Sequence, residues 1–127
     1  MAVTKTSIAV PINTSMSVTI KKRELVAHMP DSARPICSIA RPAALEAGTA
    51  RLLWYGSDDD STYYPLNDNT GNARVSVLPS AAAVAAVDLP NDLFMRWDYY
   101  QFATVDTSNA AVTQTTARTF ILFATSL

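Results

Sequence analysis

"ARLLWYGSDDDSTYYPL", residues 50–66, joins two aromatic-rich runs through a polar turn. Leucine, tryptophan and tyrosine fill residues 52–55, three aspartates follow soon after Gly56, and two tyrosines lie in the second run. Short runs of strand-forming residues on either side of Gly, Asp and Ser are typical of a β-hairpin. The stretch therefore predicts a strand over residues 50–56 and a second strand over residues 61–66 that pairs with it.

The rest of the chain continues this pattern of short β-branched or aromatic runs between turn residues. Many such runs in one chain are the signature of a sandwich or barrel. We therefore expect an all-β fold, an antiparallel β-sandwich or jelly-roll-like single domain of residues 1–127 with an extended N-terminal segment. Further strands are expected within residues 3–12, 15–20, 34–42, 73–79, 93–105 and 116–127.

Two neighbouring runs are interpreted in more detail. Alternation within residues 73–79 places side chains on opposite faces of a strand, with Ala73, Val75 and Val77 on one face and Arg74 and Ser76 on the other. Residues 80–90 are predicted to be a loop with a short helical turn, because alanine favours helix while the valines tolerate a strand.

The two most apolar runs supply the candidate core. Trp97 and Phe120 lie in these runs and are predicted to be buried. Residues 120–123 are apolar without interruption, which predicts burial on both faces of their strand. One face would pack on the second sheet and the other on a neighbouring chain or a loop, so the run is a first indication of oligomerisation.

Charge and composition narrow the classes of function. The formal net charge is −1, which does not provide the positive footprint of a nucleic-acid-binding protein. No stretch approaches the roughly 20 apolar residues of a membrane span, and no signal-peptide pattern is found, so we expect a soluble protein made in the cytoplasm. Residues 1–50 hold six basic side chains against three acidic ones, and residues 51–127 hold four against eight. This asymmetry favours contacts between copies or with a larger partner, although solvated loops explain it equally well.

Residues suited to catalysis or cofactor binding are scarce. His28, the only histidine, comes just before Pro30, and the chain has no nucleophile-elbow sequence, so a loop histidine without catalytic duty is expected. Cys37 is the only cysteine, which excludes an internal disulfide and a thiolate cluster. Three glycines cannot form a phosphate-binding loop. We therefore expect no enzyme activity and no cofactor, while a carboxylate pair for glycoside chemistry cannot be recognised from sequence spacing.

The run Asp58–Asp60 raises the question of calcium binding. It has the acid spacing with which an EF-hand loop begins, but Tyr63 and Asn69 stand where that loop needs a glycine and an acid. We expect the aspartates to hydrogen-bond the backbone of their own turn, and Gly71 to supply a positive φ in a second turn. No metal site is therefore expected, and the alternative is an irregular calcium site.

Two sets of side chains are candidates for binding a partner. Tyr55 and Tyr64 belong to adjacent aromatic pairs, and because adjacent strand residues point to opposite faces, each pair should leave one ring outside the core. Exposed aromatic rings suit protein–protein contacts and also stack on sugars. Lys21, Lys22 and Arg23 concentrate positive charge that can pair with acids on a partner.

Three segments, "GSDDDSTYYPLND" (56–68), "VDLPNDLFMRWDYYQF" (87–102) and "VTQTTARTFILFA" (112–124), carry a family resemblance. In this order and spacing they resemble a group of small structural proteins of tailed bacteriophages, over roughly residues 50–125. Asp60 stands where the family usually has glycine, and Thr113 replaces its asparagine. The matching residues are Ser57, Asp59, Thr62, Tyr63, Leu66, Leu89, Pro90, Leu93, Phe94, Trp97, Tyr99, Val112, Gln114, Arg118, Thr119, Phe120 and Leu122.

The resemblance implies a β-sandwich or jelly-roll module that decorates or cements a capsid or sits at the neck. On this basis we expect a bacteriophage virion structural protein that clamps neighbouring capsid subunits after assembly in the host cytoplasm. Its partners would be the major capsid protein or other virion proteins, without nucleic acid or membrane. A homo-oligomer is expected, with a trimer favoured because capsid lattices offer local three-fold positions.

Two alternatives remain open from the sequence. Residues 1–30 are expected to form an extended docking arm, and the competing interpretation is that one of their apolar runs is an integral strand. The chain is alternatively a carbohydrate- or receptor-binding module of a virion. That alternative predicts Tyr55, Tyr64 and a tryptophan exposed on one surface, whereas a cement protein would have them covered by neighbouring chains.

Overall fold

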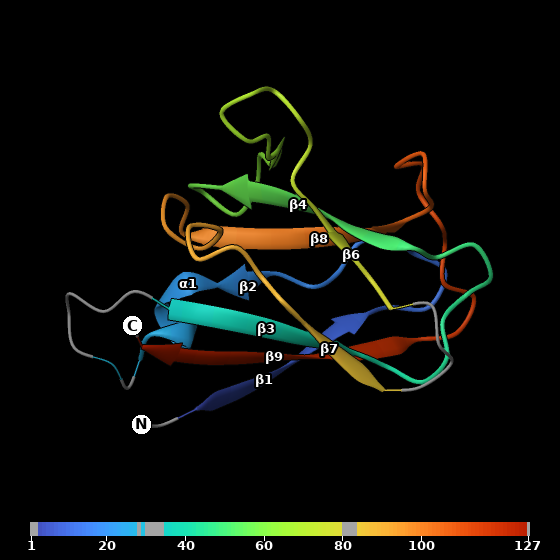
Figure 1. The fold of residues 1–127 in the computed structure, drawn as a ribbon, viewed down its shortest axis with the longest axis horizontal. Helices are drawn as coiled ribbons and strands as arrows, with labels where there is room; N and C mark the ends of the chain where they lie inside the picture. Colours follow the sequence, from blue (N-terminus) through green and yellow to red (C-terminus); the bar gives the residue numbers. More distant parts are fainter. Residues whose placement is uncertain (1–2, 28, 30–34, 80–83, 127) are drawn as a thin grey trace.

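The computed structural model describes residues 3–27, 29, 35–79 and 84–126, whose strands form two antiparallel sheets packed together (Figure 1). The first sheet has the order β1 (Thr4–Val10), β9 (Arg118–Ser126), β3 (Pro35–Arg41) and β7 (Ala85–Asp88). The second has the order β2 (Ile20–Lys21), β8 (Tyr99–Val105), β4 (Arg51–Ser57) and β5 (Tyr64–Pro65), and β6 (Val75–Val77) also pairs with β4. The expected all-β sandwich is confirmed.

Outside the run β4–β6, which lies wholly in the second sheet, strands that follow one another in the chain alternate between the two sheets. The strands β1 and β3 lie in the first sheet and β2 and β4 in the second, and β7, β8 and β9 alternate in the same way. This interleaving is jelly-roll-like. Among the described residues the only helix is α1 (Lys22–Leu25), and no helix there is long and apolar enough to cross a membrane.

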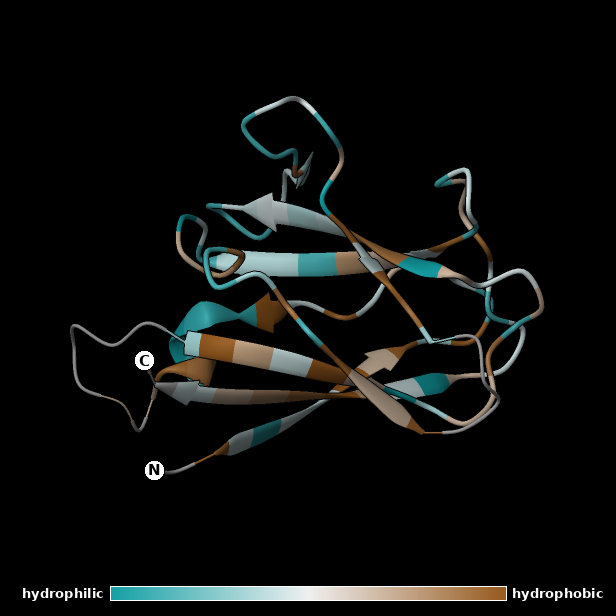
Figure 2. Ribbon diagram, viewed as in Figure 1, coloured by the Kyte–Doolittle hydropathy of each residue, from teal (hydrophilic) through white to brown (hydrophobic). Residues whose placement is uncertain are grey.

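The core between the sheets is built around a chain of aromatic rings. Trp54 on β4 makes edge contacts with Phe94 and Phe102, at ring-centroid distances of 5.5 and 5.3 Å. Phe102 continues the chain to Phe120 on β9, 5.0 Å away, and so joins the two sheets. In Figure 2 the strands are mostly coloured as neutral to hydrophobic, and much of the hydrophilic colour lies in the loops. This is expected because alternate residues of each strand point into the core between the sheets.

Strand β9 lies between β1 and β3 and is therefore paired along both edges. Phe120, Leu122 and Ala124 point inward and are fully buried, which confirms the core position of Phe120. Ile121 and Phe123 point outward and are only half-buried. The uninterrupted apolar run is thus buried on one face and partly exposed on the other, and its cover by a neighbouring chain stays a prediction.

The expected docking arm at residues 1–30 is wrong for the part of it that the structure describes. Every residue of β1 pairs with β9, from Thr4 opposite Ala124 to Val10 opposite Arg118. The alternation of β1 turns Ile8 and Val10 into the core, where they are 2% and 0% exposed. Pro11 ends the strand without interrupting it, so the competing interpretation, an integral strand, is the correct one.

Strand pairing corrects one further prediction and decides which face of β6 is buried. Residues 85–88, expected in a loop, form β7 against β3, because β3 offers an edge and Val87 packs against the core cluster. On β6 the predicted alternation is confirmed: Ser76 is buried and Val77, on the opposite face, is 61% exposed. Ser76 lies inside because its Oγ accepts a hydrogen bond of 2.9 Å from the indole Nε1 of Trp54, which needs a partner when buried.

The aspartate-rich turns follow the prediction. The Asp59 carboxylate accepts hydrogen bonds from the backbone N–H groups of Ser61 and Thr62, both at 2.9 Å. Asp60 adopts a positive φ of 58°, and Gly71 has a φ of 85°. These carboxylates therefore organise their own turns.

Cys37 on β3 should resist thiol reagents in the native protein. Its side chain is buried, and burial raises the pKa of the thiol to about 12. At pH 8.5 iodoacetamide should label the chain only in denaturant, as mass spectrometry would show. Because the native state keeps a proton that the unfolded chain releases, stability should fall as the pH rises above the ordinary thiol pKa. Rapid native labelling would contradict the burial.

Candidate functional site

An open cleft of about 620 Å³ lies where β5, the loop that follows it and the loop before β8 meet. We call it the Tyr64 cleft. It combines two aromatic rings with charged and amide side chains, a mixture found in sites that bind polar ligands. Its lining residues are Tyr64, Pro65, Leu66, Asn67, Asp68, Asn69, Arg74, Asp92, Leu93, Arg96 and Trp97.

The aromatic wall of the cleft depends on Gly56. Trp97 covers this residue so closely that a Cβ there would lie 2.6 Å from the indole ring. Tyr64 pairs with Gly56 across the hairpin, and its ring stacks on Trp97 at a centroid distance of 5.7 Å. Trp97 is therefore half-buried at the rim and not central in the core, which corrects the prediction, while Tyr64 stays 50% exposed.

The polar wall of the cleft is held by a two-point ion pair. The guanidinium of Arg74 donates to both carboxylate oxygens of Asp92, at 3.1 and 2.7 Å. These hydrogen bonds lower the pKa of Asp92 and raise that of Arg74. Arg96 brings a second cation to the lining. The cleft thus offers both donors and acceptors in a fixed arrangement.

The loop that closes the cleft is organised by Asp68. Its Oδ1 accepts hydrogen bonds from the backbone N–H groups of Thr70 and Asn72, at 2.9 and 3.0 Å, and from the Thr70 hydroxyl. The Thr70 hydroxyl and these N–H groups hold the pKa of Asp68 below its ordinary value. Asn67 also pairs with Ala73 across the loop. The lining is therefore a folded turn and not an open chain.

The two tyrosines predicted for partner binding lie on opposite faces of the second sheet. Tyr64 is opposite Gly56 and shares its face, whereas Tyr55 is opposite Pro65 and Gln101 on the outer face. Tyr55 is half-buried there. The structure therefore brings Tyr64 together with Trp97 but keeps Tyr55 away from the cleft.

The predicted basic cluster lies at β2 and α1. Lys21 is opposite Tyr99, and the Nζ of Lys22 donates to the carbonyl oxygen of Met95 at 3.0 Å. Arg23 is exposed on α1. Lys22 and Arg23 line a second cleft of about 410 Å³, together with Val26, Asp98 and Tyr99. Lys22, one of the three cations predicted to bind a partner, thus makes a hydrogen bond within the chain.

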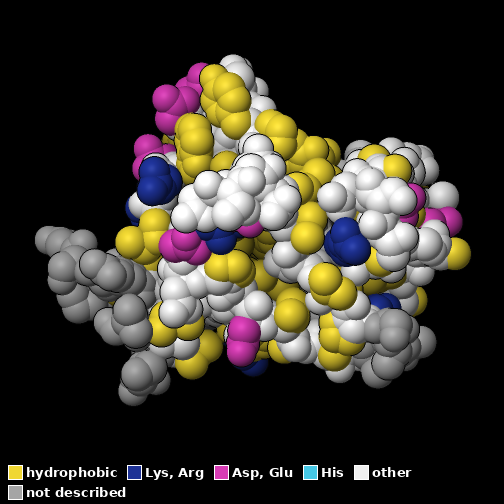
Figure 3. All heavy atoms as spheres, turned by 45° about the horizontal axis from the view of Figure 1, so that its top comes forward, with side chains coloured by type: hydrophobic (Ala, Val, Ile, Leu, Met, Phe, Trp, Pro, Cys, Tyr) yellow, Lys and Arg dark blue, Asp and Glu magenta, His cyan; other side chains and the backbone are white. Residues whose placement is uncertain are grey.

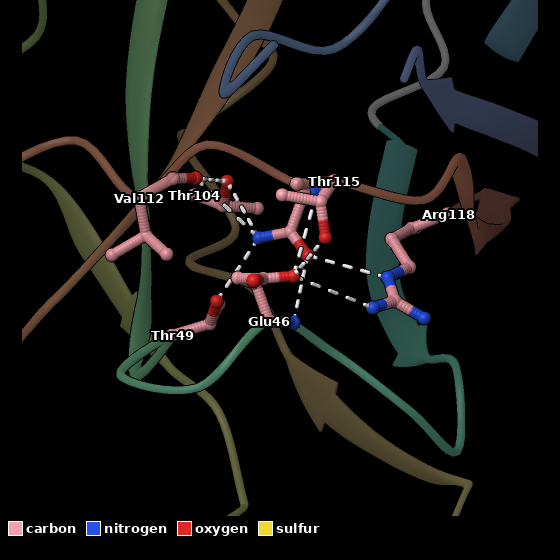
Figure 4. A network of polar contacts seen from close by, with 7 residues as sticks. Glu46, Thr49, Thr104, Val112, Thr115 and Arg118 are labelled. Carbon is pink, nitrogen blue, oxygen red and sulfur yellow. Dashed lines mark hydrogen bonds and ion pairs between the residues drawn. The ribbon is translucent and has the colours of Figure 1, made fainter. Parts of the chain in front are cut away.

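Gln114 lies at the centre of a polar network at another place in the fold (Figure 4). Its side chain is fully buried, and it ties the loop at residues 46–49 to the approach to β9. The amide nitrogen donates at 3.0–3.4 Å to Thr49, Thr104 and the carbonyl of Val112, and the amide oxygen accepts from the backbone N–H of Glu46 and from Arg118. The network therefore holds the loop at residues 46–49 against the segment that leads into β9.

Replacing Gln114 with leucine should destabilise the protein by about 2–4 kcal/mol, because the Glu46 N–H and the threonine hydroxyls would lose a buried partner. Urea titration followed by circular dichroism measures the loss. Thr115→Val is the matched control: it removes only an exposed hydroxyl contact with Glu46, so its cost should stay below about 1 kcal/mol. Equal losses in the two variants would contradict the central role of Gln114.

Within the described ranges, no group of three or more His, Cys, Asp or Glu side chains is placed to hold a metal ion. His28 lies outside the described residues. Comparison of the chain with protein-family models, curated proteins and solved structures gave no match. The Tyr64 cleft therefore has to be interpreted from its own residues.

Sequence reasoning singled out Tyr64 but missed the rest of the cleft. Arg74 and Asp92 are brought together by loops, and nothing in their spacing indicates a pair. Gly56, inside the strand at residues 51–57, could have indicated the aromatic wall of the cleft. A glycine in the interior of a strand often marks the close approach of another group. Here that group is the indole of Trp97.

Proposed function

We propose that the protein is a non-catalytic structural component of a bacteriophage particle that binds the capsid surface as a decoration or cement protein. The carrying observation is that both sheets present outer faces with little charge and many apolar side chains. Such faces suit packing against neighbouring protein subunits in an assembly.

The outer face of the second sheet illustrates this property. Leu53 and Tyr55 on β4 are half-buried, and Val77 on β6 is 61% exposed. Arg51 is the charged residue among the outward positions of β4. In Figure 3 hydrophobic side chains are spread over the visible face between small groups of charged ones. A partner can cover this surface at a low desolvation cost, because few charged groups would be removed from water.

Fold analogy and the sequence resemblance support the same proposal. Jelly rolls occur in viral capsid domains and in lectins. The residues that carry the resemblance have structural roles here. Phe94 and Gln114 are buried, and Asp59 organises a turn. The major capsid protein or another virion protein is the proposed partner.

The proposal is tested on particles of the phage that encodes this chain, purified on a density gradient. Mass spectrometry should find the chain in the particle fraction at a fixed ratio to the major capsid protein. Electron microscopy of the same particles should show density for it on the capsid surface. A chain found only in the unassembled fraction would overturn the proposal.

A second candidate function, saccharide binding, is favoured by the Tyr64 cleft. A half-exposed tyrosine stacked on Trp97 offers a flat ring for the apolar face of a sugar, and the Arg74–Asp92 pair offers hydrogen-bonding groups beside it. The cleft holds two arginines and two aspartates, which balance in charge and suit a neutral sugar.

An array of neutral and acidic oligosaccharides tests this candidate. At least one neutral sugar should bind, and Tyr64→Ala should weaken that binding about tenfold. Tyr55→Ala is the matched control, because Tyr55 lies on the opposite face of the same sheet. Equal effects of the two substitutions, or no binding at all, would reject the saccharide site.

A further inference from the structure

The outer face of the sheet β1-β9-β3-β7 is mostly apolar or hydroxyl-bearing. Alternation along the strands turns Lys5 and Ser7 outward on β1, Ile121 and Phe123 on β9, Ser38 and Ala40 on β3, and Ala86 and Asp88 on β7. Lys5, Ser7, Ala86 and Asp88 at the edges are exposed. Of the central residues, Ser38, Ile121 and Phe123 are half-buried and Ala40 is buried, at 7% exposed.

The strand register aligns four of these side chains in one row across the sheet. Lys5 is opposite Phe123, Phe123 is opposite Ser38, and Ser38 is opposite Asp88. The Nζ of Lys5 lies 5.7 Å from the centroid of the Phe123 ring, and the Ser38 hydroxyl donates to Asp88 at 2.8 Å. The row therefore begins with a cation, ends with an anion and has its one large ring on β9.

The next row repeats the same gradient of size. Ser7 is opposite Ile121, Ile121 is opposite Ala40, and Ala40 is opposite Ala86. In both rows the large side chain is on β9 and the small one is on β3. Within these two rows the β9 half of the face is therefore raised above the β3 half, whereas in the adjoining row Ile36 on β3 is opposite the smaller Thr125 on β9.

We propose that this face packs against the same face of a second copy, about a two-fold axis that runs parallel to the strands between β9 and β3. That rotation exchanges the two halves of each row. It places Lys5 over the second copy's Asp88 and Phe123 over its Ser38, and in the next row Ile121 over its Ala40. Opposite charges meet at both edges and large side chains meet small ones in the centre.

This self-complementarity identifies the occupant of the face as a second copy of the chain. A two-fold interface uses the same patch on both subunits, so the patch must match its own rotated image, as this one does in charge and, within the two rows, in size. Aligned sheets pack with strand directions within about 30° of each other, which keeps the central pairs in contact. Four strands form a small interface, so we expect association at micromolar concentration.

Sedimentation equilibrium of the full chain from about 1 to 100 µM should show a monomer–dimer equilibrium. Lys5→Asp and Asp88→Lys should each weaken dimerisation at least about tenfold, because each creates two like-charge contacts in the dimer. An equimolar mixture of the two variants should associate again, because both contacts then join opposite charges. The double variant Lys5→Asp, Asp88→Lys should also dimerise. Asp58→Lys, a charge reversal at an exposed hairpin turn, should leave dimerisation unchanged.

Recovery in the mixture cannot come from a folding defect, because both chains carry their substitutions throughout. A chain that stays monomeric at 100 µM, a trimer, or a dimer unaffected by either charge reversal would overturn the proposal. The inference goes beyond the proposed attachment to a capsid and does not depend on it. Sedimentation examines the free chain, whereas the particle analysis examines attachment, so either proposal can fail alone.

Discussion

Deletion of residues 1–12 is expected to leave the chain unable to form a soluble, cooperatively folded protein. The deletion removes β1, which pairs with β9 along its whole length, and takes Ile8 and Val10 out of the core. Each buried side chain of this size contributes roughly 1.5–3 kcal/mol, and the loss of both is comparable to the stability of a small domain. The deletion also exposes the edge of β9, whose apolar run would pair with other chains.

Circular dichroism and sedimentation velocity measure the effect of this deletion. The truncated chain should aggregate or lack a cooperative thermal transition. Removal of residues 1–3, which precede β1, is the control and should leave the melting temperature within a few degrees of the full chain. A soluble truncated protein that melts cooperatively would show that β1 is dispensable and would restore the docking-arm interpretation.

Phe120→Ala should cost about 3–5 kcal/mol in the free energy of unfolding. The ring is fully buried between the sheets, and it packs edge-on against Phe102 at 5.0 Å. Its removal leaves a cavity that the paired strands on both sides of β9 cannot close. Urea titration at low protein concentration measures the loss.

Phe123→Ala provides the matched comparison on the same strand. Phe123 points to the outer face and is half-buried, so its removal should cost less than about 1.5 kcal/mol in the monomer. The two substitutions remove the same ring from opposite faces of one strand. Equal costs would mean that the assignment of the two faces of β9 is wrong.

The strand positions could be predicted where local pattern decides the structure. Arg51–Ser57 and Arg118–Ser126 agree with the expected runs, because aromatic and β-branched residues there have no competing helical pattern. The turn role of Asp59 was predictable for the same reason, since its partners are two and three residues away. Interactions of short range are encoded in short segments.

The cleft, the strand β7 and the choice of the buried face of β6 depend on contacts between distant residues. β7 is a strand because it pairs with the edge of β3. The alanine-rich sequence before Asp88 does not itself favour a strand. Ser76 is inside because the indole of Trp54 requires an acceptor. The position of Trp97 depends on the missing side chain of Gly56. No local pattern contains these pairings, so sequence reasoning assigned Trp97 to the core.

The pairing of the first strand with the last has a consequence for synthesis of the protein. Thr4 pairs with Ala124, so the sheet that holds β1 is incomplete until β9 has left the ribosome. Before then β1 and β3 have no β9 between them, and their edges are open to other molecules. Sheets closed by such distant contacts fold slowly, in milliseconds to seconds. We therefore expect this sheet to fold only after β9 has been synthesised, and a yield of native protein that improves when synthesis is slowed by lower temperature.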